Sequence, residues 1–245
     1  MDRARAAWAA GAPAGYEGAT PLGWHIEGPF IAPTRAGVHD PARLQAPDVG
    51  AVTDWSPASG IRLVTLAPEL PGALELVAAL VASGVVVSAG HSAATFDEAR
   101  AGFDAGIRSV THLFNAMPPL DHRRPGLVGA ALVDARVTIG LIPDGLHVHP
   151  KVCALVHRTV GPDRLAVVTD AIAGLGMPPG TYQLAGRACI VDGESARLPD
   201  GGLAGSVLAM DRAVRNLAAF AGISEAEAVL AATVVPARLL GLAAA

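Results

Sequence analysis

The stretch that decides the fold runs from Ser88 to Leu132, SAGHSAATFDEARAGFDAGIRSVTHLFNAMPPLDHRRPGLVGAAL. Two apolar, β-like runs of strand length frame its first part, residues 85–88, which lead into it, and residues 107–110, which lie within it. His91 follows the first run and His112 follows the second. Side chains at the carboxyl ends of parallel strands form the sites of α/β proteins, so both histidines are candidates for function.

The segment between the two runs predicts a helix. It begins at Thr95, and Glu98 stands three residues later, which is the pattern of a capping box. It stops at Gly106, a residue type that favours the end of a helix. The whole stretch therefore predicts a strand, a helix and a second strand, with a histidine after each strand.

The same alternation of strands and helices extends along most of the chain. It indicates a parallel sheet with helical crossovers, and we expect one α/β domain over residues 1–245. Further strands are predicted at 22–26, 61–67, 137–142 and 165–169, and further helices at 72–83, at 150–160, at 209–221 and from 224 onward.

Three segments depart from this alternation. Residues 181–198 predict a β-hairpin or small meander inserted in the series. Residues 31–50 are polar and rich in proline, so we expect a loop outside the core. Residues 1–19 are rich in alanine and suggest the tail of a helix.

Composition narrows the class of protein. Hydrophobic residues make up 51% of the chain and charged residues 16%, which excludes long disordered segments. The net charge of −4 gives no basic surface for nucleic acid. The longest uncharged apolar stretch, 76–90, is shorter than the roughly 20 residues of a membrane span, and the N-terminus has no signal-peptide core. We therefore expect a cytoplasmic protein without membrane or nucleic-acid partners, in which both cysteines are core residues.

Polar residues gather where the predicted strands end, and parallel topology brings such ends to one face. Two histidines and one carboxylate form a divalent-metal site with an open position for water. Zinc suits this ligand set best, although iron, cobalt or manganese also fits. The residues at these ends are Glu27, Glu69, His91, His112, Asp144 with His147, and Asp170.

Each of these residues also has a structural interpretation. A single histidine at a strand end is more often a hydrogen-bonded structural group than a ligand. Glu27 and Glu69 could cap helices, and Asp170 could be an N-cap rather than the group that takes a proton from water. We interpret His122 and His157 as surface residues. Only the shared position at strand ends favours the metal site.

A second cluster is basic. Arg123 and Arg124 stand in DHRRPG, and His147 and His149 stand in DGLHVHP. Together with Asn115 they would suit an anionic group such as a phosphate. A solvated loop is the alternative.

Several motifs, taken together and in this order, resemble the N-acetylglucosamine-6-phosphate deacetylase family of the amidohydrolase superfamily. The resemblance extends from residue 22 to residue 242, and THLFNAM and HIEGPF are its most specific parts. The motifs are WHIEGPF, VTLAPE, SAGHSAAT, THLFNAM with RRPG, DGLHVHP, VTDA and LAGS.

The resemblance implies a metal-dependent removal of the acetyl group from N-acetylglucosamine 6-phosphate. It implies one divalent metal ion held by Glu27, His91 and His112, with Asp170 as general base and acid. Glu69 matches no ligand of the family and becomes structural. The implied substrate contacts are Val38, His39, Asn115, Ala116, Arg123, Asp144, His147, Leu203, Ala204 and Gly205.

Family members are (β/α)8 barrels with a small β-sandwich domain, and many carry a His-x-His pair after the first strand. This chain shows neither feature near its start, so we expect an incomplete barrel, without the first strand and the sandwich, and a mononuclear site. The resemblance also implies a homodimer in which Arg123 reaches the neighbouring site. The open alternatives are another N-acetylhexosamine phosphate as substrate, a reaction on a cyclic amide, or a catalytically silent fragment that binds sugar phosphate.

Overall fold

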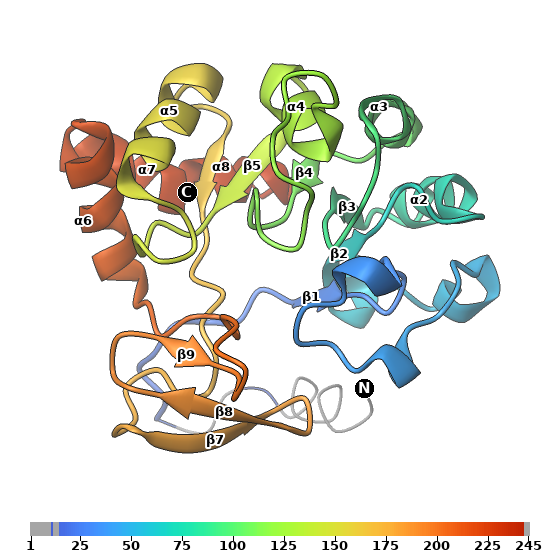
Figure 1. Ribbon diagram of the computed structural model, residues 1–245. Coiled ribbons are helices and arrows are strands. Elements are labelled where there is room, and N and C mark those ends of the chain that lie inside the picture. Colours follow the sequence, from blue (N-terminus) through green and yellow to red (C-terminus); the bar gives the residue numbers. More distant parts are fainter. Residues whose placement is uncertain (1–10, 12–14, 243–245) are drawn as a thin grey trace.

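The computed structural model describes residue 11 and residues 15–242 (Figure 1). Its centre is a six-stranded sheet in which sequential strands are neighbours and all pairs are parallel. Most of the helix tail expected at 1–19 lies outside the described residues. The strands are β1 (Trp24–Glu27), β2 (Ile61–Leu66), β3 (Val86–Ala89), β4 (Ser109–Val110), β5 (Thr138–Leu141) and β6 (Leu165–Val167).

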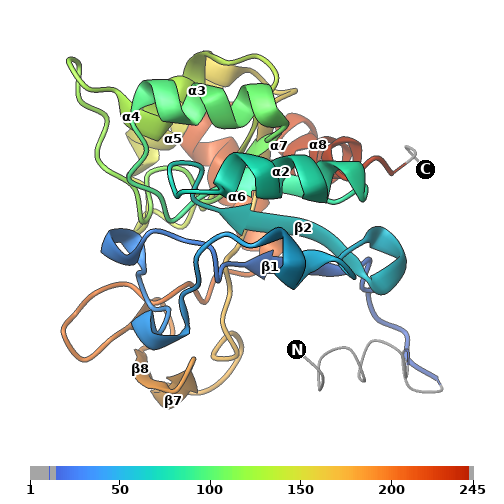
Figure 2. The ribbon, with the colours of Figure 1, turned by 90° about the vertical axis from the view of Figure 1, so that its right-hand side faces the viewer.

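Helices connect the later strands and cover one face of the sheet (Figures 1 and 2). Within the described residues β1 and β6 do not pair with each other, so the sheet is an open part of a (β/α) barrel, as predicted. None of the described helices has the length and apolar character needed to cross a membrane. The helices are α2 (Ala73–Ala82), α3 (Phe96–Ala105), α4 (Gly126–Val133), α5 (Pro150–Val160), α6 (Met210–Ala221), α7 (Glu225–Ala232) and α8 (Val234–Leu239).

The capping box predicted before α3 is present. The Glu98 backbone N–H donates to Thr95 Oγ1 at 3.3 Å, and the Thr95 backbone N–H donates to Glu98 Oε2 at 2.8 Å. The helix ends at Gly106, whose φ of 127° few other residues adopt. Two local signals therefore set the length of the crossover between His91 and His112.

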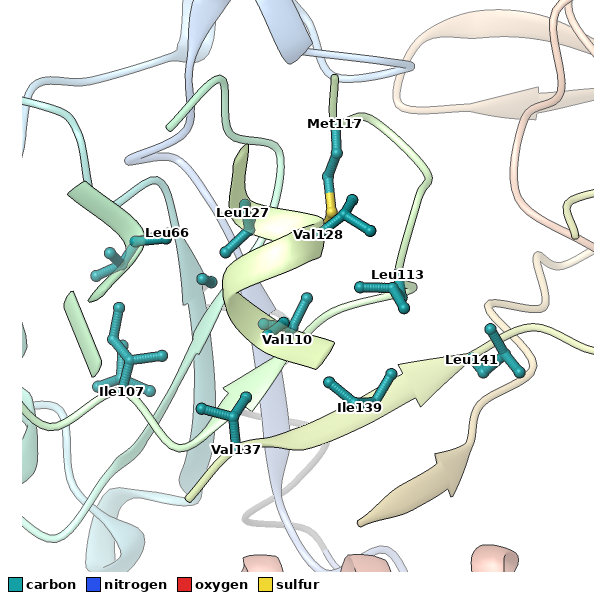
Figure 3. Close-up of a cluster of buried hydrophobic side chains, with 14 of the residues drawn as sticks. Leu66, Ile107, Val110, Leu113, Met117, Leu127, Val128, Val137, Ile139 and Leu141 are labelled. Carbon is teal, nitrogen blue, oxygen red and sulfur yellow. The ribbon is translucent and has the colours of Figure 1, made fainter. Parts of the chain in front are cut away.

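Helix α4 was not predicted from the sequence. It contains Gly126 and Gly129 and has no side-chain cap, so its intrinsic propensity is poor. Its stability comes instead from packing, because Leu127 and Val128 are at most 1% exposed. Figure 3 shows these two side chains in the apolar cluster with residues of β4 and β5. Burial of each such side chain contributes roughly 1.5–3 kcal/mol, which outweighs the cost of two glycines.

The expectation that residues 31–50 form a loop outside the core is wrong in part. Ile31, Ala32 and Ala36 are buried, and Phe30 just before them packs its ring 6.2 Å from that of Trp55. The prolines do not exclude this segment from the core, because they begin short 3-10 turns and the apolar residues between them face inward. The turns are η1 (Pro33–Arg35), η2 (Pro41–Arg43), η3 (Val49–Val52) and η4 (Pro57–Ser59).

The predicted hairpin is an antiparallel sheet with its own small core. Its strands are β7 (Gly180–Leu184), β8 (Arg187–Val191) and β9 (Ala196–Arg197), and it lies away from α2 and α3 (Figure 2). Val38 packs against its buried cluster. Arg187 Nη1 donates to the Gly37 carbonyl at 3.5 Å. The small sheet therefore supports the loop that follows β1.

Candidate metal centre and substrate cavity

The structure brings the three predicted ligands together. Glu27 is the last residue of β1, and His91 and His112 follow β3 and β4. Glu27 Oε1 lies 3.0 Å from His112 Nε2 and 3.3 Å from His91 Nε2. One ligand atom from each residue lies within 4.8 Å of the other two. A carboxylate and two imidazoles in this arrangement could hold one divalent metal.

The ring orientations support this interpretation. His91 Nδ1 lies 2.7 Å from the Arg35 carbonyl oxygen, which can only accept, so Nδ1 carries a proton. In the neutral ring, the His91 Nε2 is then unprotonated and bears a lone pair. This atom lies 3.1 Å from His112 Nε2. Lone pairs that converge so closely on a carboxylate oxygen require a proton or a cation among them. Metal-binding histidines are oriented by such bonds to backbone carbonyls.

The electrostatics of the three residues are coupled. Burial alone would raise the pKa of the Glu27 carboxyl, but hydrogen bonds with His112 and His91 hold it well below its usual range. Burial alone would lower the pKa of His112, but the Glu27 carboxylate beside it raises that pKa. The pocket therefore favours positive charge next to Glu27, which is also the requirement of a bound cation.

The backbone is strained where the site residues lie. His91, His112 and Asp170 have φ values of 49°, 30° and 49°. Such left-handed conformations cost of order 1–3 kcal/mol each for residues other than glycine and persist only where the surroundings impose them. Three strand ends thus turn sharply at the residues that face one another.

Asp170 lies after β6, on the same cavity wall as the metal-ligand candidates. Burial raises the pKa of its carboxyl, while the nearby His112 partly opposes that shift. A Cβ at position 205 would lie 2.9 Å from the Asp170 carbonyl oxygen, so Gly205 permits a close backbone approach. The Ser206 N–H donates to that carbonyl at 2.8 Å. A buried carboxyl with a raised pKa is suited to exchange protons at this position.

A cavity of about 670 Å³ opens over these residues. Its walls come from the loops after β1, β3, β4, β5 and β6, from the turn between β7 and β8, and from the glycine-rich turn before α6. Sequence-predicted residues that line it are Glu27, Val38, His39, His91, His112, Asn115, Ala116, His147, Asp170, Leu203 and Gly205.

Three predicted contact residues do not line this cavity. Ala204 is fully buried in the core of the small sheet. Asp144 lies behind His147, with its Oδ2 2.6 Å from His147 Nδ1. Arg123 is exposed and lines a separate cavity of about 480 Å³ together with Arg124.

The loop after β4 is held by its own polar groups. Asn115 Nδ2 donates to the carbonyl of His112 at 3.1 Å, and the Ala116 carbonyl accepts the Ser92 N–H at 3.2 Å. Ala116 has a φ of 52°. These bonds connect the loop that carries His112 to the loop that carries His91.

Some residues of the site gave no signal in the sequence. Arg35 and Thr34 line the cavity, and Arg35 orients His91 through its backbone carbonyl, which every residue type has. The Arg35 Nε is buried and has no hydrogen-bond partner among the described residues. Its place on the wall could have been found only from the fold of the proline-rich loop.

Glu69 and His157 make hydrogen bonds or ion pairs outside the cavity. Glu69 accepts hydrogen bonds from Ser92 Oγ at 2.7 Å and from the Ala93 N–H at 2.6 Å, in agreement with a structural role. The interpretation of His157 as a surface residue is wrong. His157 is buried on α5, and its Nε2 lies 3.1 Å from Glu227 Oε1 on α7, because that face of α5 packs inward.

The fold and site define the class of protein. The chain belongs to the amidohydrolase family, which it matches over residues 14–244. It is 41% identical over 230 residues to an N-acetylgalactosamine-6-phosphate deacetylase of Escherichia coli O157:H7, covering 93% of this chain and 61% of that protein. It is 42% identical over 198 residues to an N-acetylglucosamine-6-phosphate deacetylase of Lysinibacillus sphaericus, covering 80% of this chain and 51% of that protein.

Solved structures give the same class. The chain is similar to a mutant N-acetyl-D-glucosamine-6-phosphate deacetylase from Mycobacterium smegmatis in complex with N-acetyl-D-glucosamine-6-phosphate. The TM-score is 0.87 and the identity 42%, over 91% of this chain and 60% of that one. An N-acetylglucosamine-6-phosphate deacetylase from Pasteurella multocida matches with a TM-score of 0.88 and 31% identity, over 98% of this chain and 62% of that one. The chain thus spans between half and about three fifths of the length of these relatives.

Proposed function

We propose that this protein is a metal-dependent deacetylase of N-acetylhexosamine 6-phosphates, with N-acetylglucosamine 6-phosphate as its principal substrate. One observation carries the proposal: Glu27, His91 and His112 converge in the cavity that Asp170 also lines. The names of the relatives at about 40% identity support the substrate class.

The reaction is the hydrolysis of an amide. Water adds to the acetyl carbonyl carbon, the C–N bond breaks, and acetate leaves the sugar amine. A divalent metal bound by Glu27, His91 and His112 would polarise the carbonyl and make water more acidic. Asp170 takes a proton from the attacking water on a carboxylate oxygen and gives it to the departing nitrogen. Both transfers need one group that can hold a proton briefly, and burial of Asp170 favours its protonated form.

The other cavity residues bind and orient the sugar. His39 approaches Glu27, with its Nε2 3.9 Å from Glu27 Oε2, and would contact the acetamide end. Asn115 and Ala116 lie beside His112, where they can contact the ring hydroxyls. His147 would contact the phosphate. Leu203 and Gly205 also line the cavity and would contact the sugar through their backbone groups.

We propose zinc as the metal, because two imidazoles and one carboxylate are its usual catalytic ligands. Iron, cobalt and manganese accept the same donors. A metal analysis of protein purified without added metal would identify the ion.

We also propose a homodimer in which Arg123 binds the phosphate in the neighbouring subunit. Its support is position: Arg123 is exposed and faces a different cavity from the one that holds the metal-ligand candidates of its own chain. A guanidinium is well matched to a phosphate, so a partner's site would give it a function.

A cytoplasmic location accords with this substrate and with two free, buried cysteines, which need no oxidising compartment.

The N-acetylgalactosamine isomer is the second candidate substrate. It is favoured by the Escherichia coli relative, whose name gives that sugar. The two sugars differ only at one hydroxyl, so the same cavity could accept either.

Acetate release tests the proposal. The protein is incubated with N-acetylglucosamine 6-phosphate, with its galactosamine isomer and with unphosphorylated N-acetylglucosamine. We expect turnover of the first, slower turnover of the second and little of the third, all abolished in Asp170→Asn. Faster turnover of the galactosamine isomer would reverse the order of substrates. No acetate from any of the three, with metal bound, would contradict the function and favour a reaction on a cyclic amide or a silent sugar-phosphate-binding protein.

A further inference from the structure

Asp144 is built into the site but separated from the cavity by His147. Both side chains are nearly buried, with 8% and 6% of their surfaces exposed. His147 lines the main cavity, whereas Asp144 faces a small one of about 90 Å³ on its other side. A substrate could therefore contact His147 directly but could reach Asp144 only through it.

Both oxygens of the Asp144 carboxylate are already engaged. Its Oδ1 accepts the backbone N–H groups of Leu146 and His147, each at 2.8 Å. Its Oδ2 lies 2.6 Å from His147 Nδ1. These hydrogen bonds lower the pKa of the Asp144 carboxyl although burial alone would raise it. Asp144 is thus an anion whose oxygens are directed at its own loop.

This geometry determines what His147 can offer to a ligand. The carboxylate only accepts, so His147 Nδ1 must carry a proton, and Nε2 is the ring nitrogen left for the cavity. A neutral ring would present a lone pair there, which repels an anion. An anionic oxygen requires Nε2–H, and therefore a doubly protonated ring, whose charge the Asp144 carboxylate stabilises at short range.

We propose that Asp144 is a positioning residue that holds His147 as a doubly protonated donor to an anionic oxygen of the substrate. This inference rests on the proposed function and deepens it, since the phosphate is the anionic group of that substrate. Asp144 itself makes no contact with the sugar phosphate. It fixes both the direction and the charge of the group that does.

The loop around the pair is rigid enough for this role. Asn216 Nδ2, on α6, donates to the Pro143 carbonyl at 2.9 Å. Val148 is buried, and its carbonyl accepts Cys153 Sγ–H from α5 at 3.7 Å. The loop is therefore attached to two helices on either side of the pair.

Carboxylates lie on both sides of His147. The Asp170 carboxyl, after β6, lines the same cavity as His147, and His112 lies near Asp170. On the far side of Asp144, Arg212 of α6 and Glu194 line the small cavity, and the Cys153 thiol of α5 is neutral because burial raises its pKa to about 11. Two carboxyl groups, those of Asp144 and Asp170, thus lie near His147. Among the described residues, no Lys or Arg side chain forms an ion pair with Asp144 Oδ2 in place of His147.

Histidine ring NMR tests the inference without turnover. Protein labelled with 15N in histidine is titrated with inorganic phosphate at pH 7, and the His147 signals are assigned by their loss in His147→Gln. We expect both ring nitrogens of His147 to be protonated in the phosphate complex of the unmodified protein. A neutral His147 ring in that complex would overturn the proposal.

Asp144→Asn is the informative variant, and Asp192→Asn is its matched control. Asp192 also accepts two backbone N–H groups, from Glu194 and Ser195, but holds no histidine. We expect Asp144→Asn to weaken phosphate binding at least tenfold at pH 7 and to lose the doubly protonated ring. Asp192→Asn should bind phosphate normally. Unchanged phosphate affinity in folded Asp144→Asn would overturn the proposal.

Kinetics distinguish this role from a purely structural one. Asp144→Asn should raise KM for the phosphorylated sugar, with little change in kcat. Asp144→Asn combined with His147→Gln should be no worse than His147→Gln alone, because Asp144 acts through that ring. Independent, multiplying effects of the two changes would contradict the proposal. Phosphate binding that depends on Asp144 in a protein that releases no acetate would support this inference and refute the deacetylase assignment alone.

Discussion

The apolar cluster behind the sheet and the carboxyl ends of its strands differ in packing and backbone conformation, although the same strands form both. Val110, at the end of β4, is fully buried in the apolar cluster between sheet and helices (Figure 3). His112, two residues later, has a φ of 30° and a buried Nδ1 without a hydrogen-bond partner in the part of the chain that the structure describes. Burial in the cluster stabilises the fold, whereas the carboxyl ends of the strands carry strained backbone and a buried nitrogen without a hydrogen bond among the described residues. The difference shows that stability and chemistry are separated along a few residues of each strand.

The separation predicts that the edge can lose its chemistry without losing the fold. Asp170→Asn should lower kcat for acetate release by about a thousandfold, because the proton acceptor is lost. Its free energy of unfolding should stay the same or rise, because a buried carboxyl is replaced by a neutral amide. Steady-state kinetics and urea unfolding measure the two effects. A large loss of stability with activity retained would show that Asp170 is structural.

The apolar cluster should behave in the reverse way. Leu127→Ala should lower the free energy of unfolding by about 3 kcal/mol, because a fully buried side chain leaves a cavity. Metal content and kcat of the folded protein should hardly change. Val133→Ala is the control in the same helix, since Val133 is 71% exposed and should lose under about 0.5 kcal/mol. Equal losses in both variants would mean that α4 does not pack as described.

Loss of one ligand candidate, His112, should weaken the metal site. His112→Ala should weaken metal binding by at least about a hundredfold, since one of three protein donors disappears. Mass spectrometry of the purified protein and competition with a chelator measure the effect. His157→Ala is a histidine control, because His157 lies on α5, contacts Glu227 on α7 and lines neither cavity of the site. Metal retained in His112→Ala would remove it from the ligand set.

Arg123 extends the comparison to a second chain. Arg123→Ala should raise KM for the phosphorylated sugar about tenfold and leave unphosphorylated sugar unaffected, because only the phosphate contact is removed.

Mixed dimers test whether that contact comes from the neighbour. Equal mixtures of Arg123→Ala and Asp170→Asn subunits should regain about a quarter of the unmodified sites, since half the dimers are mixed and each holds one intact site. No recovery, in dimers shown to exchange, would place Arg123 in its own chain's site.

The smallest expected effect lies at an ion pair far from the cavity. Arg136 donates to both oxygens of Asp134, at 2.9 and 2.6 Å, and this contact lowers the pKa of Asp134 to about 2. A depressed carboxyl pKa stabilises the fold above the unfolded pKa of about 4, and that stability is lost as the pH falls toward 2. Asp134→Asn should therefore cost about 1 kcal/mol at pH 7, and the difference should shrink between pH 4 and pH 2. A pH-independent difference in urea unfolding would contradict this account.

The edge of the sheet was easier to predict than the region behind it. Glu27, His91 and His112 were among the candidates because parallel topology places strand ends together, and the family resemblance selected Glu27 over Glu69 as the carboxylate ligand. Helix α4 was not found, because its glycines hide a helix that tertiary packing creates. Burial of Ile31 between prolines was not expected for the same reason. Arg35 acts through a backbone carbonyl, which leaves no trace in a sequence.

The central claim is that Glu27, His91 and His112 hold one metal ion. Anomalous diffraction from crystals of the protein grown with zinc tests it most directly. We expect a single strong peak in this cavity, about 2.0–2.2 Å from Glu27 Oε1 and from the Nε2 atoms of His91 and His112. No peak there, or a zinc ion bound to other residues while these three side chains remain in contact with one another, would contradict it.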